Sequence, residues 1–255
     1  MKIALIQSPL IWENPKANRI AFEKKINAIA SDIDLIVLPE MFTTGFTMNP
    51  VVVAETMQGE TVQWLQTLAK AKTTAITGSV VIEEDGNYYN RLLFVFPSGE
   101  IQQYDKRHLF THAGEEKKYT AGKEKLIINY LGWKICLLVC YDLRFPIFSR
   151  NTENYDLLVY VANWPESRIL AWDSLLRARS IENLCYTIGV NRVGEDANLL
   201  NFNGHSQLID SLGLYTIKPQ EEEGIFIAEI NQTELIANRK KFNFLADADT
   251  FEIKD

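Results

Sequence analysis

The sequence predicts an α/β protein in which strands and helices alternate along the chain. Short apolar runs, typical of buried strands, are separated by segments whose apolar residues recur at helical spacing. Turns at Asp85-Gly86 and Pro97-Ser98-Gly99 separate runs that lie close enough to pair as hairpins. Strands and helices mixed at this density form layers, and two sheets between two layers of helices would suit this many strands. Periodicity alone leaves one open sheet as an alternative.

The predicted strands are short runs of apolar and β-branched residues. In chain order they are Lys2–Gln7, Leu35–Leu38, Ala75–Ile82, Tyr88–Phe96, Ile101–Asp105, Leu126–Tyr130, Trp133–Val139, Leu157–Val161, Cys185–Val190, Ser206–Ile209 and Gly224–Ile230. Between Lys106 and Lys125 the chain is polar and has little periodicity, so we expect a long loop there. Loops of that length are uncommon unless they are functional.

The predicted helices carry one apolar face each. They are Asn14–Ala30, Glu60–Ala71, Leu170–Glu182 and Asn231–Asn238. In the first of them Pro15 stands near the start, where its missing N–H is not needed. Phe22, Ile26 and Ile29 then recur at the spacing that places them on one side of a helix.

The composition is that of an ordinary folded protein of one domain, residues 1–255. Of the 255 residues 47% are hydrophobic and 23% are charged, with no linker or internal repeat. Length alone would also allow two small domains. A chain of this size can bury enough apolar surface to fold without disulfides or metal ions.

Charge and cysteine usage exclude several classes of partner. A net charge of −7 argues against a nucleic-acid partner and against an anionic membrane surface. No apolar run is long enough to span a membrane, and the start MKIALIQSP lacks the long apolar stretch of a secretory signal. Cys136, Cys140 and Cys185 form no CxxC pair, which indicates free thiols in a cytoplasmic protein.

The histidines do not predict a metal site. His108, His112 and His205 have no zinc-binding spacing relative to the cysteines. His108 and His112 lie four residues apart, which suits a metal only on a helix, and the nearby Gly114 favours a loop. We therefore expect no metal and no cofactor.

Three polar residues stand where predicted strands end. Glu40, Lys106 and Cys140 each follow an apolar or alternating run. In open α/β sheets, functional sites form outside the carboxyl ends of strands. Taken singly, such a Glu or Lys is usually a solvated surface residue, and such a Cys is usually a small buried apolar residue. Their joint occurrence predicts a catalytic site.

The segments around these residues resemble the motifs of the carbon-nitrogen hydrolase, or nitrilase, superfamily. DLIVLPEMFTTGF contains Glu40, YDKRHLF contains Lys106 and LVCYDLRFP contains Cys140, in the order and at the spacing of that superfamily. The resemblance continues through VANWP at Val161–Pro165 and LLRARSIEN at Leu175–Asn183. It implies a four-layer αββα sandwich and an enzyme that uses the three residues together.

The chemistry of the three residue types fits amide hydrolysis. A cysteine attacks as its thiolate, and Glu40 could accept the thiol proton as general base. Lys106, a compact positive charge, could stabilise the oxyanion, with the backbone N–H of Tyr141 as a second donor. Attack on an amide would release ammonia and leave a thioester on Cys140, which water would hydrolyse.

The resemblance implies further features that the residues alone do not fix. It implies a second glutamate in HAGEEKKYTAG, which is either Glu115 or Glu116, and the distance to Gly122 favours Glu115. It also implies a homodimer of sandwiches. The tail, residues 239–255, is too apolar for a free terminus, so we expect it at the interface between the two copies.

Substrate choice is less visible in the sequence. The segments ANWPESR and NRVGEDANLLNFNGHSQLID resemble the omega-amidase branch, which implies hydrolysis of 2-oxoglutaramate to 2-oxoglutarate and ammonia. Arg144 could clamp a substrate carboxylate, or it could form a structural ion pair. Aromatic residues that could line a small pocket, or simply pack, are Phe42, Phe46, Tyr119, Trp164 and Trp172.

Two other functions remain open. The same three residues would serve an N-carbamoyl amidase or a nitrilase, because all three chemistries pass through a covalent adduct on cysteine. A scaffold of this fold that binds a partner without catalysis is the alternative from another class. A papain-like protease is disfavoured, because His205 is the only histidine downstream of Cys140.

Overall fold

Two six-stranded sheets form the centre of the molecule, whose computed structural model describes residues 1–29 and 32–253. The first sheet has the order β14-β1-β2-β3-β4-β5 and the second β13-β12-β9-β8-β7-β6. The strands of the first are β1 (Lys2–Gln7), β2 (Leu35–Val37), β3 (Ala75–Glu84), β4 (Asn87–Val95), β5 (Ile101–Asp105) and β14 (Gly224–Glu229). Those of the second are β6 (Leu126–Tyr130), β7 (Trp133–Val139), β8 (Leu157–Val161), β9 (Tyr186–Val190), β12 (Gln207–Ile209) and β13 (Tyr215–Ile217).

Both sheets are mixed, with parallel strands at the centre and antiparallel strands outside. In the first sheet β1, β2 and β3 run parallel, and β4, β5 and β14 add antiparallel pairs. In the second β7, β8 and β9 run parallel, and β6, β12 and β13 add antiparallel pairs. The carboxyl ends of the parallel strands therefore meet at one edge of each sheet, where sites form in α/β proteins.

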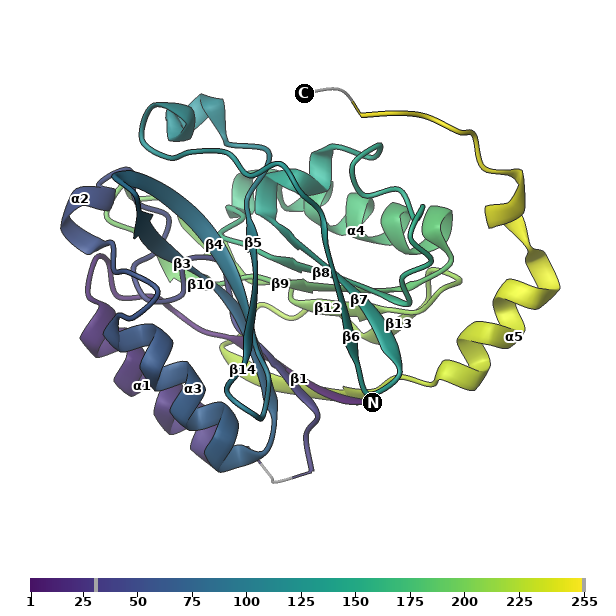
Figure 1. Ribbon diagram of the computed structural model, residues 1–255, viewed down its shortest axis with the longest axis horizontal. Coiled ribbons are helices and arrows are strands. Elements are labelled where there is room, and N and C mark those ends of the chain that lie inside the picture. The colour runs from purple at the N-terminus through teal and green to yellow at the C-terminus, as the bar shows by residue number, and fades with distance from the viewer. Residues whose placement is uncertain (30–31, 254–255) are drawn as a thin grey trace.

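Helices cover the outer face of each sheet, which confirms the predicted four-layer αββα sandwich (Figure 1). The first sheet is covered by α1 (Pro15–Ala28) and α3 (Glu60–Lys72), and the second by α4 (Ile169–Asn183). The α1 helix begins where predicted, because the side chain of Asn14 accepts a hydrogen bond from the Ala17 amide at 3.1 Å. Its buried residues include Phe22 and Ile26, as the spacing predicted. Ala30, the predicted last residue of this helix, lies outside the described residues.

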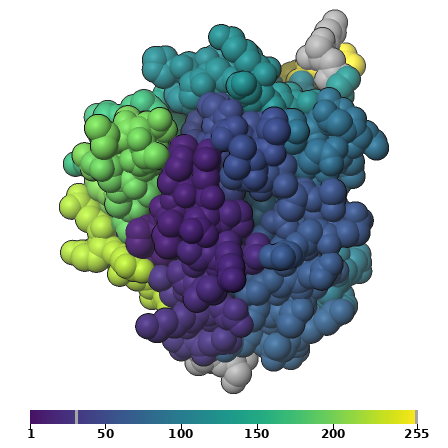
Figure 2. Space-filling view, turned by 90° about the vertical axis from the view of Figure 1, so that its left-hand side faces the viewer, coloured from purple at the N-terminus to yellow at the C-terminus, as the bar shows by residue number. Residues whose placement is uncertain are grey.

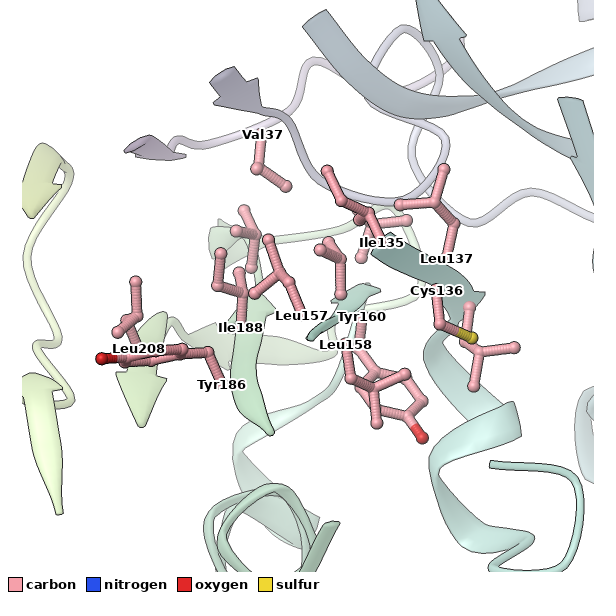
Figure 3. Close-up of a cluster of buried hydrophobic side chains, with 14 of the residues drawn as sticks. Val37, Ile135, Cys136, Leu137, Leu157, Leu158, Tyr160, Tyr186, Ile188 and Leu208 are labelled. Carbon is pink, nitrogen blue, oxygen red and sulfur yellow. The ribbon is translucent and has the colours of Figure 1, made fainter. Parts of the chain in front are cut away.

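The layer between the sheets is built from side chains that alternate along each strand. Figure 3 shows Val37 of β2 pointing toward Ile135 and Leu157 of the second sheet. Cys136 and Tyr160, each on the other face of its strand, point to the opposite side of that sheet. All five are buried, so both faces of the second sheet are apolar.

Several short elements have no signal in the sequence. They are α2 (Pro50–Val53), β10 (Val193–Glu195), β11 (Asn201–Asn203) and β13. Segments of three or four residues are too short to show either periodicity, so tertiary contacts decide them. The predicted loop after Lys106 has two 3₁₀ turns, at Thr111–Ala113 and Glu115–Lys117.

The last helix, α5 (Gln232–Phe242), is longer than predicted and is followed by an extended tail (Figure 1). Helix α5 ends at Asn243, which has the left-handed backbone that commonly caps helices. Phe244 and Phe251 of the tail are exposed, and the dimer stays a prediction. The last two residues of the tail lie outside the described part of the chain. Within that part, no helix is long and apolar enough to cross a membrane.

Helix α4 approaches the second sheet closely at Gly189 of β9, which leads to a stability prediction. A Cβ at Gly189 would lie 2.6 Å from Trp172 Cζ2 and would also overlap Leu176, both on α4. We expect Gly189→Ala to lower the free energy of unfolding by about 1–3 kcal/mol through overpacking, measured by urea denaturation. In Gly224→Ala, the matched control on β14, the new Cβ meets a ring atom of Phe226 at 3.0 Å. Equal losses in both variants would contradict the packing argument.

Candidate active site

Three charged side chains from separate segments meet in the interior. Glu40 follows β2, Lys106 follows β5, and Glu115 stands in the second 3₁₀ turn of the long loop. The Nζ of Lys106 donates to Glu40 Oε1 at 3.0 Å and to Glu115 Oε1 and Oε2 at 3.0 and 2.9 Å. All three side chains are fully buried. Glu116, the other candidate, is exposed, so Glu115 is the glutamate that contacts Lys106.

The positive charge of Lys106 holds this cluster together. Burial works against the ammonium, but Glu115 and Glu40 outweigh that cost, and the pKa of Lys106 is raised above its ordinary value. Lys106 therefore stays charged at neutral pH. Burial raises the pKa of Glu115, while Lys106 and the backbone N–H of Phe110, which donates to Glu115 Oε2 at 2.5 Å, oppose that rise.

Two asparagines fix the orientation of Glu40. Asn90 Nδ2 donates to Glu40 Oε1 at 2.8 Å. Asn163 donates twice, from its backbone N–H to Glu40 Oε2 at 2.8 Å and from Nδ2 to the Glu40 carbonyl at 2.5 Å. The sequence analysis did not select either asparagine. The available signal for Asn90 was an amide side chain inside the predicted strand Tyr88–Phe96, because a buried amide needs a polar partner.

Cys140 stands at a sharp turn directly after β7. Its φ of +45° lies in the left-handed region, which is uncommon for a residue with a side chain and which ends the strand abruptly. The Sγ lies 4.0 Å from the Asn163 carbonyl, next to the residue that orients Glu40. Burial and the negative charge of Glu40 raise the pKa of the Cys140 thiol well above its usual range, and Lys106 opposes that rise. The resting thiol is therefore protonated and poised beside a carboxylate.

A buried carboxylate, Asp142, holds this turn in place. It accepts hydrogen bonds from the Val139 amide at 2.9 Å and the Tyr104 hydroxyl at 2.8 Å. On the other side it contacts His108, through the backbone N–H at 3.0 Å and through Nδ1 at 2.8 Å. Asp142 thus connects the turn that carries Cys140 to the end of β5 that carries Lys106. The sequence analysis passed over Asp142, although it lies within the motif that contains Cys140.

Cys140 lies in the wall of a cavity of about 550 Å³, whereas the charged cluster is buried behind that wall. The lining residues come from the first fifty residues, the long loop, the Cys140 turn, the segment after β8 and the β10–β11 region. On the face shown in Figure 2, purple and blue N-terminal segments adjoin teal and green parts of the chain. Apolar contributions come from Trp12, Met48, Phe110, Leu200 and Phe202.

The predicted substrate-binding residues divide between the cavity and the core. Phe46, Tyr141, Arg144 and Trp164 line the cavity, as expected. Tyr119 is not among the lining residues.

The three predicted aromatic residues that do not line the cavity, Phe42, Tyr119 and Trp172, pack elsewhere. Tyr119 is buried beside Met41, and its hydroxyl donates to the Thr47 carbonyl at 2.7 Å, which supports the cavity wall from behind. Phe42 packs under α1 and α3, and Trp172 packs from α4 onto the second sheet. Sequence spacing could not separate pocket from core, because both are apolar.

Residues 1–29 and 32–253 contain no group of three or more His, Cys, Asp or Glu side chains placed to hold a metal ion. His108 contacts Asp142 and stacks on Phe145 with ring centroids 3.8 Å apart, and His112 lines the cavity beside the Phe110 ring.

The charge balance around Cys140 predicts how its alkylation responds to pH. Because the thiolate is the reacting form, a raised pKa means that the rate of alkylation by iodoacetamide keeps rising into the alkaline range. Glu40→Gln removes a negative charge that raises this pKa, so we expect its rate profile to shift toward lower pH. Site-resolved mass spectrometry of the alkylated peptides measures the rate at Cys140 alone.

Glu116→Gln is the matched control, since it removes one negative charge from the exposed neighbour of Glu115. Its profile should follow that of the unmodified protein. Cys136 and Cys185 are buried, and burial raises the pKa of Cys185 to about 12, so both should stay unlabelled. A Glu40→Gln profile that is unchanged, or shifted to higher pH, would contradict this electrostatic account.

Comparison with known sequences identifies relatives along nearly the whole chain. The sequence model of the carbon-nitrogen hydrolase family matches residues 2–240. The chain is 44% identical over 254 residues to Omega-amidase YafV of Yersinia enterocolitica, which covers 98% of each chain. It is 34% identical over 237 residues to the 2-oxoglutaramate amidase of Bacillus subtilis, which covers 91% of each chain.

A solved structure also resembles this chain along its whole length. XC1258 from Xanthomonas campestris, a CN-hydrolase superfamily protein whose crystal structure carries an arsenic adduct in the active site, superposes with a TM-score of 0.98. That pair is 42% identical, and the superposition covers 100% of this chain and 99% of the other. The sandwich fold, the sequence motifs and these relatives agree, and the chain belongs to the carbon-nitrogen hydrolase family of the nitrilase superfamily.

Proposed function

We propose that this hydrolase cleaves the terminal amide of a small 2-oxo dicarboxylic acid monoamide, with 2-oxoglutaramate as the substrate, through a thioester on Cys140. The observation that carries the proposal is the buried Glu40–Lys106–Glu115 cluster behind a cavity-facing thiol. The names of the relatives from Yersinia enterocolitica and Bacillus subtilis support the choice of amide.

The first half of the reaction forms the acyl-enzyme. Glu40 accepts the proton of the Cys140 thiol, and the thiolate attacks the amide carbon. The negative charge then passes to the carbonyl oxygen, where the Lys106 ammonium and the Tyr141 backbone N–H stabilise it. Glu40 returns its proton to the amide nitrogen, the C–N bond breaks, and ammonia leaves a thioester on Sγ.

The second half returns the enzyme to its resting state. Glu40 takes a proton from water as the water oxygen attacks the thioester carbon. When the tetrahedral intermediate collapses, the C–S bond breaks and the proton passes from Glu40 to Sγ. The net reaction converts one amide and one water into one carboxylic acid and one ammonia. The cluster, Cys140 and the bound substrate together keep the same net charge, because each step moves a proton among them. The cluster alone loses one negative charge while Glu40 holds the proton.

Glu115 acts in this scheme by holding Lys106. Its two oxygens accept from Nζ, so one Lys106 position is fixed from both sides by Glu40 and Glu115. A carboxylate that is itself held by the Phe110 amide gives the ammonium a rigid support. A preorganised charge needs no rearrangement when the oxyanion forms, which is how such groups lower a barrier.

The substrate assignment predicts which compounds release ammonia. We expect rapid release from 2-oxoglutaramate, and little turnover of glutamine, of a simple nitrile or of an N-carbamoyl amino acid, measured side by side. Cys140→Ala should lower the rate by about 10³-fold or more, because it removes the nucleophile. If the nitrile or the carbamoyl compound were turned over faster, that compound would replace the 2-oxo amide as the proposed substrate. Absence of turnover with all four would favour a binding scaffold.

Because Glu115 contacts Lys106 and Glu116 is exposed, we expect substitutions of these two adjacent residues to affect kcat differently. Glu115→Gln removes one of the two carboxylates on Lys106, so we expect kcat to fall by about 10²- to 10⁴-fold while KM changes little. Glu116→Gln, the matched control, should leave kcat within about twofold, since Glu116 is exposed. Steady-state ammonia release tests both, and equal effects of the two substitutions would refute a specific role of Glu115.

A further inference from the structure

Two arginines face the cavity beside Cys140. Arg144 stands at the end of the 3₁₀ turn that begins with Cys140, and Arg168 stands at the end of the 3₁₀ turn Glu166–Arg168. Both line the cavity and both are half-buried. The sequence analysis selected Arg144 as a possible carboxylate clamp and gave Arg168 no role.

Aromatic rings hold both guanidinium groups in place. The Arg144 guanidinium carbon lies 4.9 Å from the centroid of the Trp164 ring, and that of Arg168 lies 5.4 Å from the Phe110 ring. Trp164 Nε1 in turn donates to the Arg168 carbonyl at 2.9 Å, which connects the two positions. Stacked guanidinium groups lose little further freedom when they bind a ligand, so they are preorganised for one.

Neither guanidinium forms an ion pair within the described part of the chain. Two more deeply buried arginines do: Arg91 contacts Asp105 at 2.7 Å, and Arg179 contacts Glu182 at 2.9 Å. A third, Arg192, donates to backbone carbonyl oxygens instead. A half-buried guanidinium without a counter-ion is electrostatically incomplete.

The acidic residues of the cavity wall are committed to their own loops. Glu13 accepts a hydrogen bond from the Thr47 hydroxyl. Asp196 accepts from the backbone N–H groups of Asn198 and Leu200, at 2.8 and 3.0 Å. The cavity therefore presents two unpaired positive charges and no carboxylate that pairs with them. Burial and the like charge of Arg144 lower the pKa of Arg168, while Cys140 opposes that fall, and a bound anion would raise this pKa.

We propose that Arg168 is a specificity-determining residue that, together with Arg144, binds the carboxylate of the substrate while Cys140 attacks the amide at its other end. The inference rests on the proposed function and deepens it, because it states which part of the substrate the enzyme requires. Two guanidinium groups offer more donors than one carboxylate can accept, so a neighbouring 2-oxo oxygen can share them. An amide that lacks a negative charge leaves both arginines unpaired and binds weakly.

The kinetic test compares charged and neutral amides in the intact enzyme. We expect Arg168→Gln to lower kcat/KM for 2-oxoglutaramate by about 10- to 100-fold, mainly through KM, because it removes charge-assisted hydrogen bonds. Its kcat/KM for pentanamide, which has no carboxylate, should stay within about twofold. Arg177→Gln on the exposed surface of α4 is the matched control and should change neither value. Equal losses for both amides would overturn the assignment, since a folding defect lowers both.

A double substitution tests whether the two arginines share one group. Arg144→Gln combined with Arg168→Gln should cost less than the product of the single effects, because both contact the same carboxylate. Arg168→Lys keeps the positive charge, so its kcat/KM should lie between that of the unmodified enzyme and that of Arg168→Gln. Strictly multiplicative effects would refute a shared carboxylate.

A binding measurement separates this inference from the proposed function. In Cys140→Ala, calorimetry should detect glutarate binding that weakens about 10- to 100-fold when Arg168→Gln is added. If the parent enzyme does not hydrolyse 2-oxoglutaramate but glutarate binding still depends on Arg168, the proposed substrate fails and the carboxylate site stands. If 2-oxoglutaramate is hydrolysed but glutarate binds equally with and without Arg168, the proposed function stands and the role of Arg168 is refuted.

Discussion

The buried ion pairs between Lys106 and its two glutamates are the constraint on which the site depends. Removing three charges from water costs several kcal/mol for each, and only close opposite charges and complete hydrogen bonding offset that cost. Here the ammonium contacts Glu40 and Glu115, and Asn90, Asn163 and the Phe110 amide satisfy the carboxylates. Loss of any partner would leave a buried charge uncompensated. The ends of β2 and β5 and the long loop are therefore held in one arrangement.

The turn at Cys140 is the second constraint, and it depends on the same parts of the fold. A non-glycine residue with positive φ costs about 1–3 kcal/mol, so its surroundings must hold it there. Asp142 holds the turn by accepting hydrogen bonds from the Val139 amide and the Tyr104 hydroxyl. Arg179 of α4 donates to the Leu143 carbonyl at 2.6 Å. Asp142 also holds His108, two residues after Lys106, so the turn at Cys140 and the Lys106 ammonium cannot move independently.

The two regions on either side of Cys140, the buried cluster and the cavity wall, differ in charge. Behind Cys140, burial and the negative charge of Glu40 raise the thiol pKa, and the proposed reaction uses Glu40 as the proton acceptor. In the cavity wall Arg144 and Arg168 stay positively charged and unpaired among the described residues, and they complement an acidic substrate. Aromatic side chains, including Phe46 over Lys106 at 5.0 Å, lie between the two regions and keep water away from the cluster. An amide that carries a carboxylate at its far end matches this division of charge.

The sequence by itself determined the layered α/β fold, most of the strands, and the three residues at strand ends. Those features are local, because apolar periodicity and the residue that follows a strand can be read along the chain. The sequence favoured Glu115 over Glu116, and the tertiary structure shows that Glu115 is the one that contacts Lys106. The tertiary structure alone decided that Asn90, Asn163 and Asp142 hold the site, and that Tyr119 lies behind the cavity rather than in it. These contacts join segments far apart in the chain, and burial, which distinguishes a buried glutamate from its exposed neighbour, follows from packing rather than from residue type.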